Sequence, residues 1–116
     1  MYKHQREFII FFKDILEAIL KIERYTDSLT IAQALEEEMR FDAILKNLEN
    51  IGEAANAIPD NIKAKYSKIP YTQIYRLRNI LSHEYFGIDK EEIEKIIQDD
   101  LPILKRQVIE VLNSEK

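Results

Sequence analysis

Residues that break helices or form tight turns are scarce in this chain, which has two glycines and three prolines among 116 residues. Strands joined by hairpins need such residues at their turns. The long stretches between them are rich in Leu, Ile, Ala, Glu and Lys, which favour helix. The sequence therefore predicts an all-α chain, and its length fits one domain over residues 1–116 with a single hydrophobic core.

Apolar residues at helical spacing predict the first two helices. The first is expected from Lys3 to Tyr25, before a polar turn. A capping box of Thr30 with Gln33 would open the second. We expect this second helix to continue through an irregular point at Glu36-Glu37-Glu38 and on towards residue 58.

The rest of the chain is divided by its prolines and glycines. Pro59 should stop the second helix, and Pro70 should lie in the first turn of the third, after a short helical turn. Asp89 with Glu92 is a candidate capping box for the last helix, which Pro102 should kink or split near residue 100. These elements predict an antiparallel, up-and-down four-helix bundle with short extra helical turns.

Gly52 lies inside the apolar stripe of the second helix. A glycine inside a helix costs about 1 kcal/mol relative to alanine. We therefore expect that another helix approaches closely at this position.

Positive charge is concentrated in one part of the chain, although the net charge is −4. The flanking residues 1–60 and 84–100 each carry an excess of acids. Residues 61–83 contain no acid and five cations, which are Lys63, Lys65, Lys68, Arg76 and Arg78. This charge pattern has two interpretations. The first is a solvated, lysine-rich loop without a binding role, and the second is a surface that binds a polyanion.

Composition also bears on where the protein works. It has no cysteine, which excludes a disulfide framework and thiolate zinc sites and fits a reducing compartment. The longest apolar run, Phe8–Phe12, is far shorter than the ~20 residues that span a bilayer, and its flanks do not form a signal peptide. We therefore expect a soluble, cytoplasmic protein that does not contact a membrane.

The segment Arg78-Asn79-Ile80-Leu81-Ser82-His83-Glu84-Tyr85 combines groups suited to phosphodiester chemistry without a metal. Arginine presents a planar fork of donors to phosphate, and histidine exchanges protons near neutral pH. A tyrosine hydroxyl can bind phosphate or be modified. Taken singly, each has a structural alternative: His83 as a hydrogen-bonded helix-end residue, Arg78 as a surface ion pair, Tyr85 as part of the core.

Helical geometry separates the two principal groups of this segment. Arg78 and Tyr85 share one face, whereas Asn79 and His83 share another, and Arg78 lies about 140° from His83. The arginine could curl around a helix that loosens towards Gly87. Alternatively, two copies of the helix could face each other across a dimer axis and share their side chains.

Other functional motifs are absent from the sequence. His4 and His83 are the only histidines, which leaves no histidine cluster for a metal, and there is no P-loop or G-x-G-x-x-G motif. We therefore expect no metal and no cofactor. Glu53, among small and apolar neighbours, is expected to pair with an arginine, and orientation of Arg78 is one role for it.

The sequence resembles the HEPN-domain toxins of the HepT type, which are found beside minimal nucleotidyltransferase antitoxins. The resemblance covers nearly the whole chain. Its specific parts are the Ile51-Gly52-Glu53-Ala54 element and the R-N-x3-H-x-Y pattern from Arg78 to Tyr85, and Ile69-Pro70-Tyr71 and Asp100-Leu101-Pro102 also fit. Tyr71 stands where the family often has tryptophan after the proline, so an aromatic residue is kept.

The resemblance implies a HEPN-like bundle that forms a homodimer and works as a metal-independent endoribonuclease in a type VII toxin–antitoxin system. Arg78 would hold the scissile phosphate, His83 would be the general acid or base, and Asn79 would orient either one. Tyr85 would accept AMP from a cognate nucleotidyltransferase, which silences the toxin. The alternative is a non-catalytic helical module that docks to the nucleotidyltransferase and presents nucleotide or substrate to it.

Overall fold

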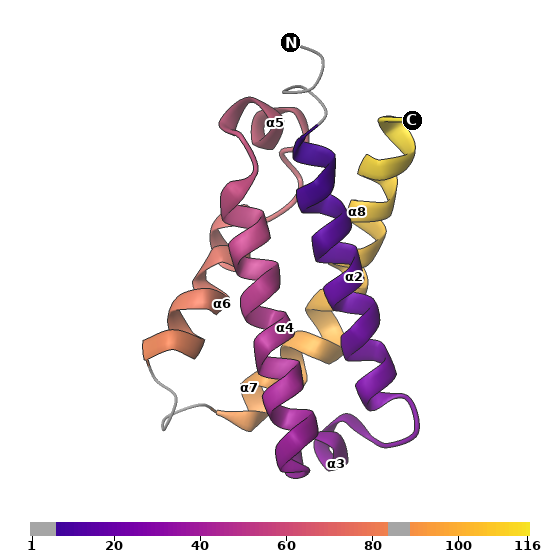
Figure 1. Cartoon of the computed structure of the whole chain (residues 1–116), viewed down its shortest axis with the longest axis vertical. Coiled ribbons are helices and arrows are strands. Elements are labelled where there is room, and N and C mark those ends of the chain that lie inside the picture. The colour runs from indigo at the N-terminus through magenta and orange to yellow at the C-terminus, as the bar shows by residue number, and fades with distance from the viewer. Residues whose placement is uncertain (1–6, 84–88) are drawn as a thin grey trace.

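The computed structural model describes residues 7–83 and 89–116, and for residues 79–83 it describes the backbone alone. Every regular element within these ranges is a helix (Figure 1). The elements are α2 (Phe8–Thr26), α3 (Ile31–Glu36), α4 (Glu38–Ala57), α5 (Asp60–Lys65), α6 (Tyr71–His83), α7 (Lys90–Lys95), the π-helical turn η2 (Ile96–Asp100) and α8 (Leu101–Ser114).

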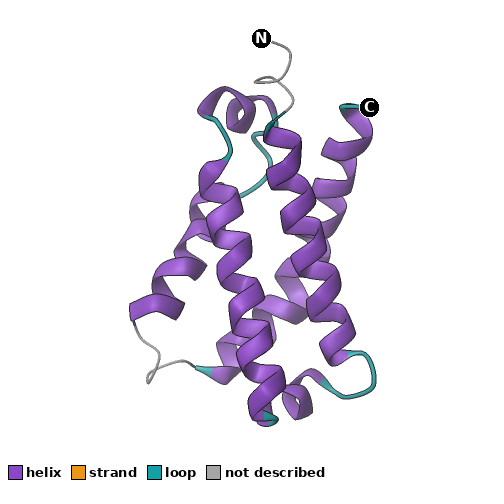
Figure 2. Ribbon diagram, viewed as in Figure 1, coloured by secondary structure: helices purple, strands orange, loops and turns teal. Residues whose placement is uncertain are grey.

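Four long helical units alternate in direction along the chain, which confirms the predicted all-α antiparallel bundle. They are α2, α4, α6 and the continuous run from α7 through η2 to α8. Figure 2 shows short loops, together with α3 and α5, in the connections among the first three of these units. Helix α2 packs against both α4 and α8, whereas α6 packs against α4 on the other side. No helix in the described ranges is long and apolar enough to cross a bilayer.

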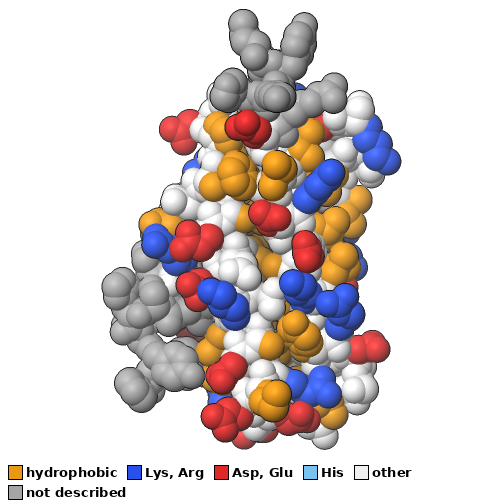
Figure 3. All heavy atoms as spheres, viewed as in Figure 1, with side chains coloured by type: hydrophobic (Ala, Val, Ile, Leu, Met, Phe, Trp, Pro, Cys, Tyr) orange, Lys and Arg blue, Asp and Glu red, His pale blue; other side chains and the backbone are white. Residues whose placement is uncertain are grey.

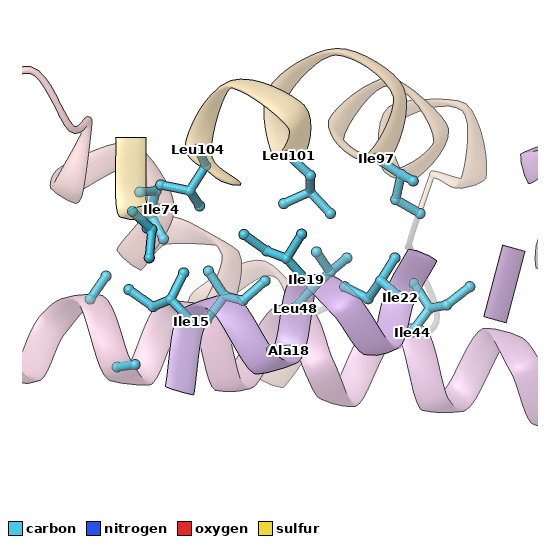
Figure 4. Close-up of a cluster of buried hydrophobic side chains, with 14 of the residues drawn as sticks. Ile15, Ala18, Ile19, Ile22, Ile44, Leu48, Ile74, Ile97, Leu101 and Leu104 are labelled. Carbon is cyan, nitrogen blue, oxygen red and sulfur yellow. The ribbon is translucent and has the colours of Figure 1, made fainter. Parts of the chain in front are cut away.

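The core lies between these units and is almost entirely aliphatic (Figure 4). Helix α2 supplies one apolar stripe, in which Phe12, Ile15, Ile19 and Ile22 have no exposed surface. Helix α4 faces it with buried Ile44, Leu48 and Ile51, and the remaining walls include Ile74, Ile97, Leu101 and Leu104. The helical spacing of these residues is what the sequence predicted.

The second predicted helix is two helices. The Thr30–Gln33 capping box forms as expected, but α3 ends at Glu36 and α4 begins at Glu38. Between them Glu37 adopts an extended conformation, with φ −87° and ψ 117°. The irregular point expected at Glu36–Glu38 is therefore present, but it divides the predicted helix into two instead of leaving it continuous.

Proline and aspartate mark the other boundaries. Helix α4 ends at Ala57, two residues before Pro59, and α6 begins directly after Pro70. Asp89 caps α7 by accepting a hydrogen bond from the Glu91 backbone at 2.9 Å, rather than through the expected box with Glu92. The predicted start of the first helix at Lys3 lies outside the described residues.

Pro102 disturbs the last helix as predicted. The helix widens into the π turn η2 over residues 96–100, and Pro102 lies in the first turn of α8. Proline has no N–H to donate and its ring crowds the carbonyl four residues earlier. A π turn is one way to accommodate both effects without breaking the helix.

Candidate active site

Gly52 brings α6 against α4 at the position of Arg78. A Cβ atom on Gly52 would lie 3.1 Å from the Arg78 backbone nitrogen and 3.2 Å from the Ile74 carbonyl oxygen. The close approach expected from the sequence is therefore present. It fixes the backbone of Arg78 on the surface of α4, one residue away from Glu53.

The side chain of Arg78 lies between an acid and a phenol. Its Nε is 2.5 Å from Oε1 of Glu53 on α4, and its Nη1 donates a 3.2 Å hydrogen bond to the hydroxyl of Tyr75 on α6. The hydrogen bond to Tyr75 and then the charge of Glu53 raise the pKa of Arg78. The cation is thus held in place, yet 40% of the arginine side chain stays exposed and can meet a ligand.

Helix α6 carries the rest of the predicted motif. Its regular backbone runs from Tyr71 to His83, so Arg78, Asn79 and His83 belong to one helix. The side chains of Asn79 and His83 are not among those described, and Tyr85 lies outside the described residues. The structure therefore brings Arg78 together with Glu53, and leaves the catalytic grouping of Arg78 with His83 as a prediction.

Tyr75 is a site residue that the sequence analysis missed. The half-buried ring lies 5.9 Å from the guanidinium carbon of Arg78. The signal was available, because residues three apart on a helix are neighbours and Tyr75 precedes Arg78 by three positions.

A groove of about 630 Å³ opens beside Tyr75, between the end of α4, α5 and the first turns of α6. Its polar lining is Asn56, Asp60, Lys63, Thr72 and Gln73, and its apolar lining is Ile69, Pro70, Tyr71 and Tyr75. The Tyr71 hydroxyl donates to the Tyr66 carbonyl at 2.8 Å, and burial, followed by the influence of Tyr66, raises the pKa of Tyr71 to about 12. Tyr71 is therefore a neutral wall of this groove at physiological pH.

A second groove, of about 480 Å³, lies on the other side of Arg78, between α2 and α4. Its charged residues are Asp14, Glu17 and Glu53 against the single cation Lys21. Figure 3 shows acidic and basic side chains scattered over this face, rather than one positive surface. Arg78 thus contacts one lining residue of each groove, Glu53 here and Tyr75 opposite.

The cations of residues 61–78 do not form one continuous patch. Lys63 lies over the Tyr71 ring, with its Nζ 5.9 Å from the ring centre. Lys65 instead pairs with Glu115 just after α8, where its Nζ is 2.8 Å from Oε2 of that acid. In the described part of the chain, no group of three or more His, Asp or Glu side chains could hold a metal ion.

Comparisons with known proteins bear on what this site does. The model of the "Ribonuclease HepT-like" family matches residues 15–111. A protein of Methanocaldococcus jannaschii, provisionally named an RNase, is 34% identical over 90% of this chain and 95% of its own length. A protein of Thermococcus cleftensis named a probable ribonuclease HepT is 36% identical over 82% of this chain and 86% of its own.

A further relative, from Caldanaerobacter subterraneus and also provisionally named an RNase, is 40% identical over 64% of this chain and 66% of its own. No solved structure matches the chain. The family model spans most of the sequence, including Gly52, Glu53, Arg78 and His83, and the fold is the expected helical bundle. The chain therefore belongs to the HepT-like ribonuclease family.

Proposed function

We propose that this protein is a metal-independent endoribonuclease, acting as the toxin of a toxin–antitoxin pair. The observation that carries the proposal is the half-exposed Arg78 guanidinium, held by Glu53 and Tyr75 on the helix that also bears His83. A fixed cation that keeps an exposed face can bind a phosphodiester and stabilise the charge that develops on it. Membership of a ribonuclease family favours RNA as that phosphodiester.

In this reaction the ribose 2′-hydroxyl attacks the adjacent phosphorus. His83 takes the proton from the 2′-hydroxyl or gives one to the departing 5′-oxygen, depending on its protonation state. Arg78 stabilises the phosphorane-like transition state, and Asn79 orients the phosphate or the histidine. The products are a 2′,3′-cyclic phosphate and a 5′-hydroxyl, so DNA is not cleaved.

The site is completed in a homodimer. Arg78 and His83 lie about 140° apart around an ideal helix, so one copy alone does not direct both at one phosphate unless the arginine bends around. Two copies of α6 facing each other across a two-fold axis would supply both groups to each site. Size-exclusion chromatography with light scattering tests this part of the proposal.

Silencing acts through Tyr85. A cognate nucleotidyltransferase would attach AMP to its hydroxyl and so place a phosphate where RNA must bind, which repels the substrate. Tyr85→Phe should keep toxicity and escape covalent silencing when the active partner is co-expressed. Full silencing of Tyr85→Phe, to the extent seen for the wild type, would show that complex formation suffices.

The decisive experiment is RNA cleavage in excess EDTA by the purified wild type, His83→Ala and Arg78→Ala. Arg106→Ala, which removes an exposed cation on α8, is the matched control. We expect cyclic phosphate ends from the wild type and Arg106→Ala only. If a folded wild type, shown by mass to carry no AMP, cleaves none of several RNAs, the non-catalytic module that docks to a nucleotidyltransferase becomes the better description.

A further inference from the structure

We propose that Tyr75 and the groove beside it bind an unpaired nucleobase of the RNA, adjacent to the phosphate held by Arg78. This inference rests on the proposed function, because it assumes that Arg78 contacts a phosphate of RNA. It adds a binding residue outside the R-x4-H-x-Y motif and specifies the substrate class as single-stranded RNA.

The position of Tyr75 on α6 supports this assignment. At about 100° per residue, Tyr75 lies about 60° around the helix from Arg78, and it precedes Arg78 by about 4.5 Å along the axis. Its hydroxyl accepts a 3.2 Å hydrogen bond from Nη1 of Arg78. A phosphate bound at Arg78 would therefore place a neighbouring nucleotide next to Tyr75, whichever copy of the chain supplies His83.

The chemistry of the groove suits a base. Unpaired bases are bound by stacking on aromatic rings and by hydrogen bonds to their edges. Here the Tyr75 ring is half-buried and lines the groove, and Asn56, Thr72 and Gln73 supply amide and hydroxyl groups. Lys63 lines the same groove and adds a cation for the backbone of the strand.

Charge distinguishes this groove from the one on the opposite side of Arg78. The α2–α4 groove presents Asp14, Glu17 and Glu53 against a single lysine, and a polyanion would be repelled there. The Tyr75 groove has one acid, Asp60, and one base, Lys63. An RNA strand bound at Arg78 should therefore extend towards Tyr75.

Binding of an oligoribonucleotide made non-cleavable by 2′-O-methylation tests the inference without catalysis. Tyr75→Leu should raise Kd about tenfold or more, since each stacked base contributes about 1–3 kcal/mol. Tyr75→Phe keeps the ring but removes the hydroxyl that accepts from Arg78, so its Kd should rise by less than that of Tyr75→Leu. The matched control is Phe11→Leu, which removes a half-buried ring from the acidic groove and should leave Kd unchanged.

A second measurement covers the case in which Tyr75→Leu does not fold. The chain has no tryptophan, so Tyr75→Trp introduces a single tryptophan, which keeps an aromatic face and can be excited apart from the tyrosines. Single-stranded RNA should quench its emission, and duplex RNA should not. Phe11→Trp should show no quenching with either.

The outcomes separate this inference from the proposed function. If the wild type cleaves RNA but Tyr75→Leu binds it as tightly as the wild type, the inference is wrong and the function stands. If the wild type does not cleave but Tyr75→Leu binds more weakly, the function is wrong and the binding site stands. Equal quenching at positions 75 and 11, or no RNA binding by the wild type, would overturn the inference.

Discussion

The backbone nitrogen of Arg78 lies 3.1 Å from the point at which Gly52 would carry a Cβ atom. Few atoms in proteins come so close to a Cβ, and here the neighbour is helix backbone, which does not move aside as a flexible side chain would. The glycine therefore sets the spacing of α4 and α6, and with it the reach of Arg78 to Glu53.

Gly52→Ala should lower the kcat of RNA cleavage while it changes the free energy of unfolding only slightly. The added methyl gains about 1 kcal/mol of helix propensity but overpacks the contact, at about 1–3 kcal/mol. The small net change in unfolding free energy, measured by urea titration, would accompany a displaced Arg78 and a lower kcat. Asn50→Ala, exposed on the same helix, is the control, and wild-type cleavage by Gly52→Ala would contradict this view of the contact.

Glu53→Gln should lower kcat without raising KM. The substitution keeps the size of the side chain but removes the charge that holds Arg78 Nε at 2.5 Å, and we expect a loss of about tenfold in kcat. Removing a negative charge beside the bound phosphate should leave KM unchanged or lower. The control is Glu17→Gln, which breaks an exposed ion pair with Lys21 in the same groove and should leave kcat and KM unchanged. If Glu53→Gln has the same kcat as the wild type, Arg78 does not need the charge of Glu53 to act.

Phe12→Ala should destabilise the fold by about 3–5 kcal/mol. Its ring has no exposed surface and makes edge-to-face contacts with Phe8 and Tyr66, each with centroids 6.1 Å apart. The alanine would leave a cavity where α2 meets the segment after α5. Ile10→Ala on the same helix, where the side chain is 56% exposed, should change the unfolding free energy by less than about 1 kcal/mol.

The stability that the protein gains where the end of α8 meets Lys65 and Tyr66 should depend on pH, because the contact is made by the carboxylate of Glu115. Hydrogen bonds from Lys65 and then Tyr66 lower the pKa of Glu115 below its ordinary value of 4.5. Its stabilising contribution is thus present above that value and is lost as the pH falls through the lower, folded-state pKa. Glu115→Gln should melt about 2–4 °C below the wild type at pH 7.

Acidification supplies the test of that sign. The difference in Tm between the wild type and Glu115→Gln should shrink as the pH falls below about 4.5. Glu110→Gln, exposed near the end of α8, should track the wild type throughout. A gap that does not shrink on acidification would mean that the charge of Glu115 is not what stabilises the contact.

Local signals in the sequence predicted most of the fold. The Thr30–Gln33 box, the stop before Pro59 and the disturbance at Pro102 all depend on neighbouring residues, and all three are present. The irregular point expected at Glu36–Glu38 is present too, as the extended Glu37. Apolar periodicity continues across this one residue, so the pattern did not show that the helix is divided there.

The site was harder to predict, because its contacts join distant parts of the chain. Gly52 signalled a close approach but not which helix would make it. The run of cations from Lys63 to Arg78 looked like one surface in the sequence, yet Glu115, 50 residues beyond Lys65, draws that lysine away. The spacing of Tyr75 and Arg78 predicts that they are neighbours on one helix, but the groove that Tyr75 lines is shown only by the structure.

The π turn at Ile96–Asp100 has a consequence for the buried face of this last helix. The buried positions Ile93, Ile97, Leu101, Leu104, Val108 and Val111 are spaced by four, four, three, four and three residues. These steps average 3.6 residues, which is the repeat of an α-helix. One apolar stripe therefore runs from α7 through the π turn into α8, so Pro102 is accommodated without the loss of a core position.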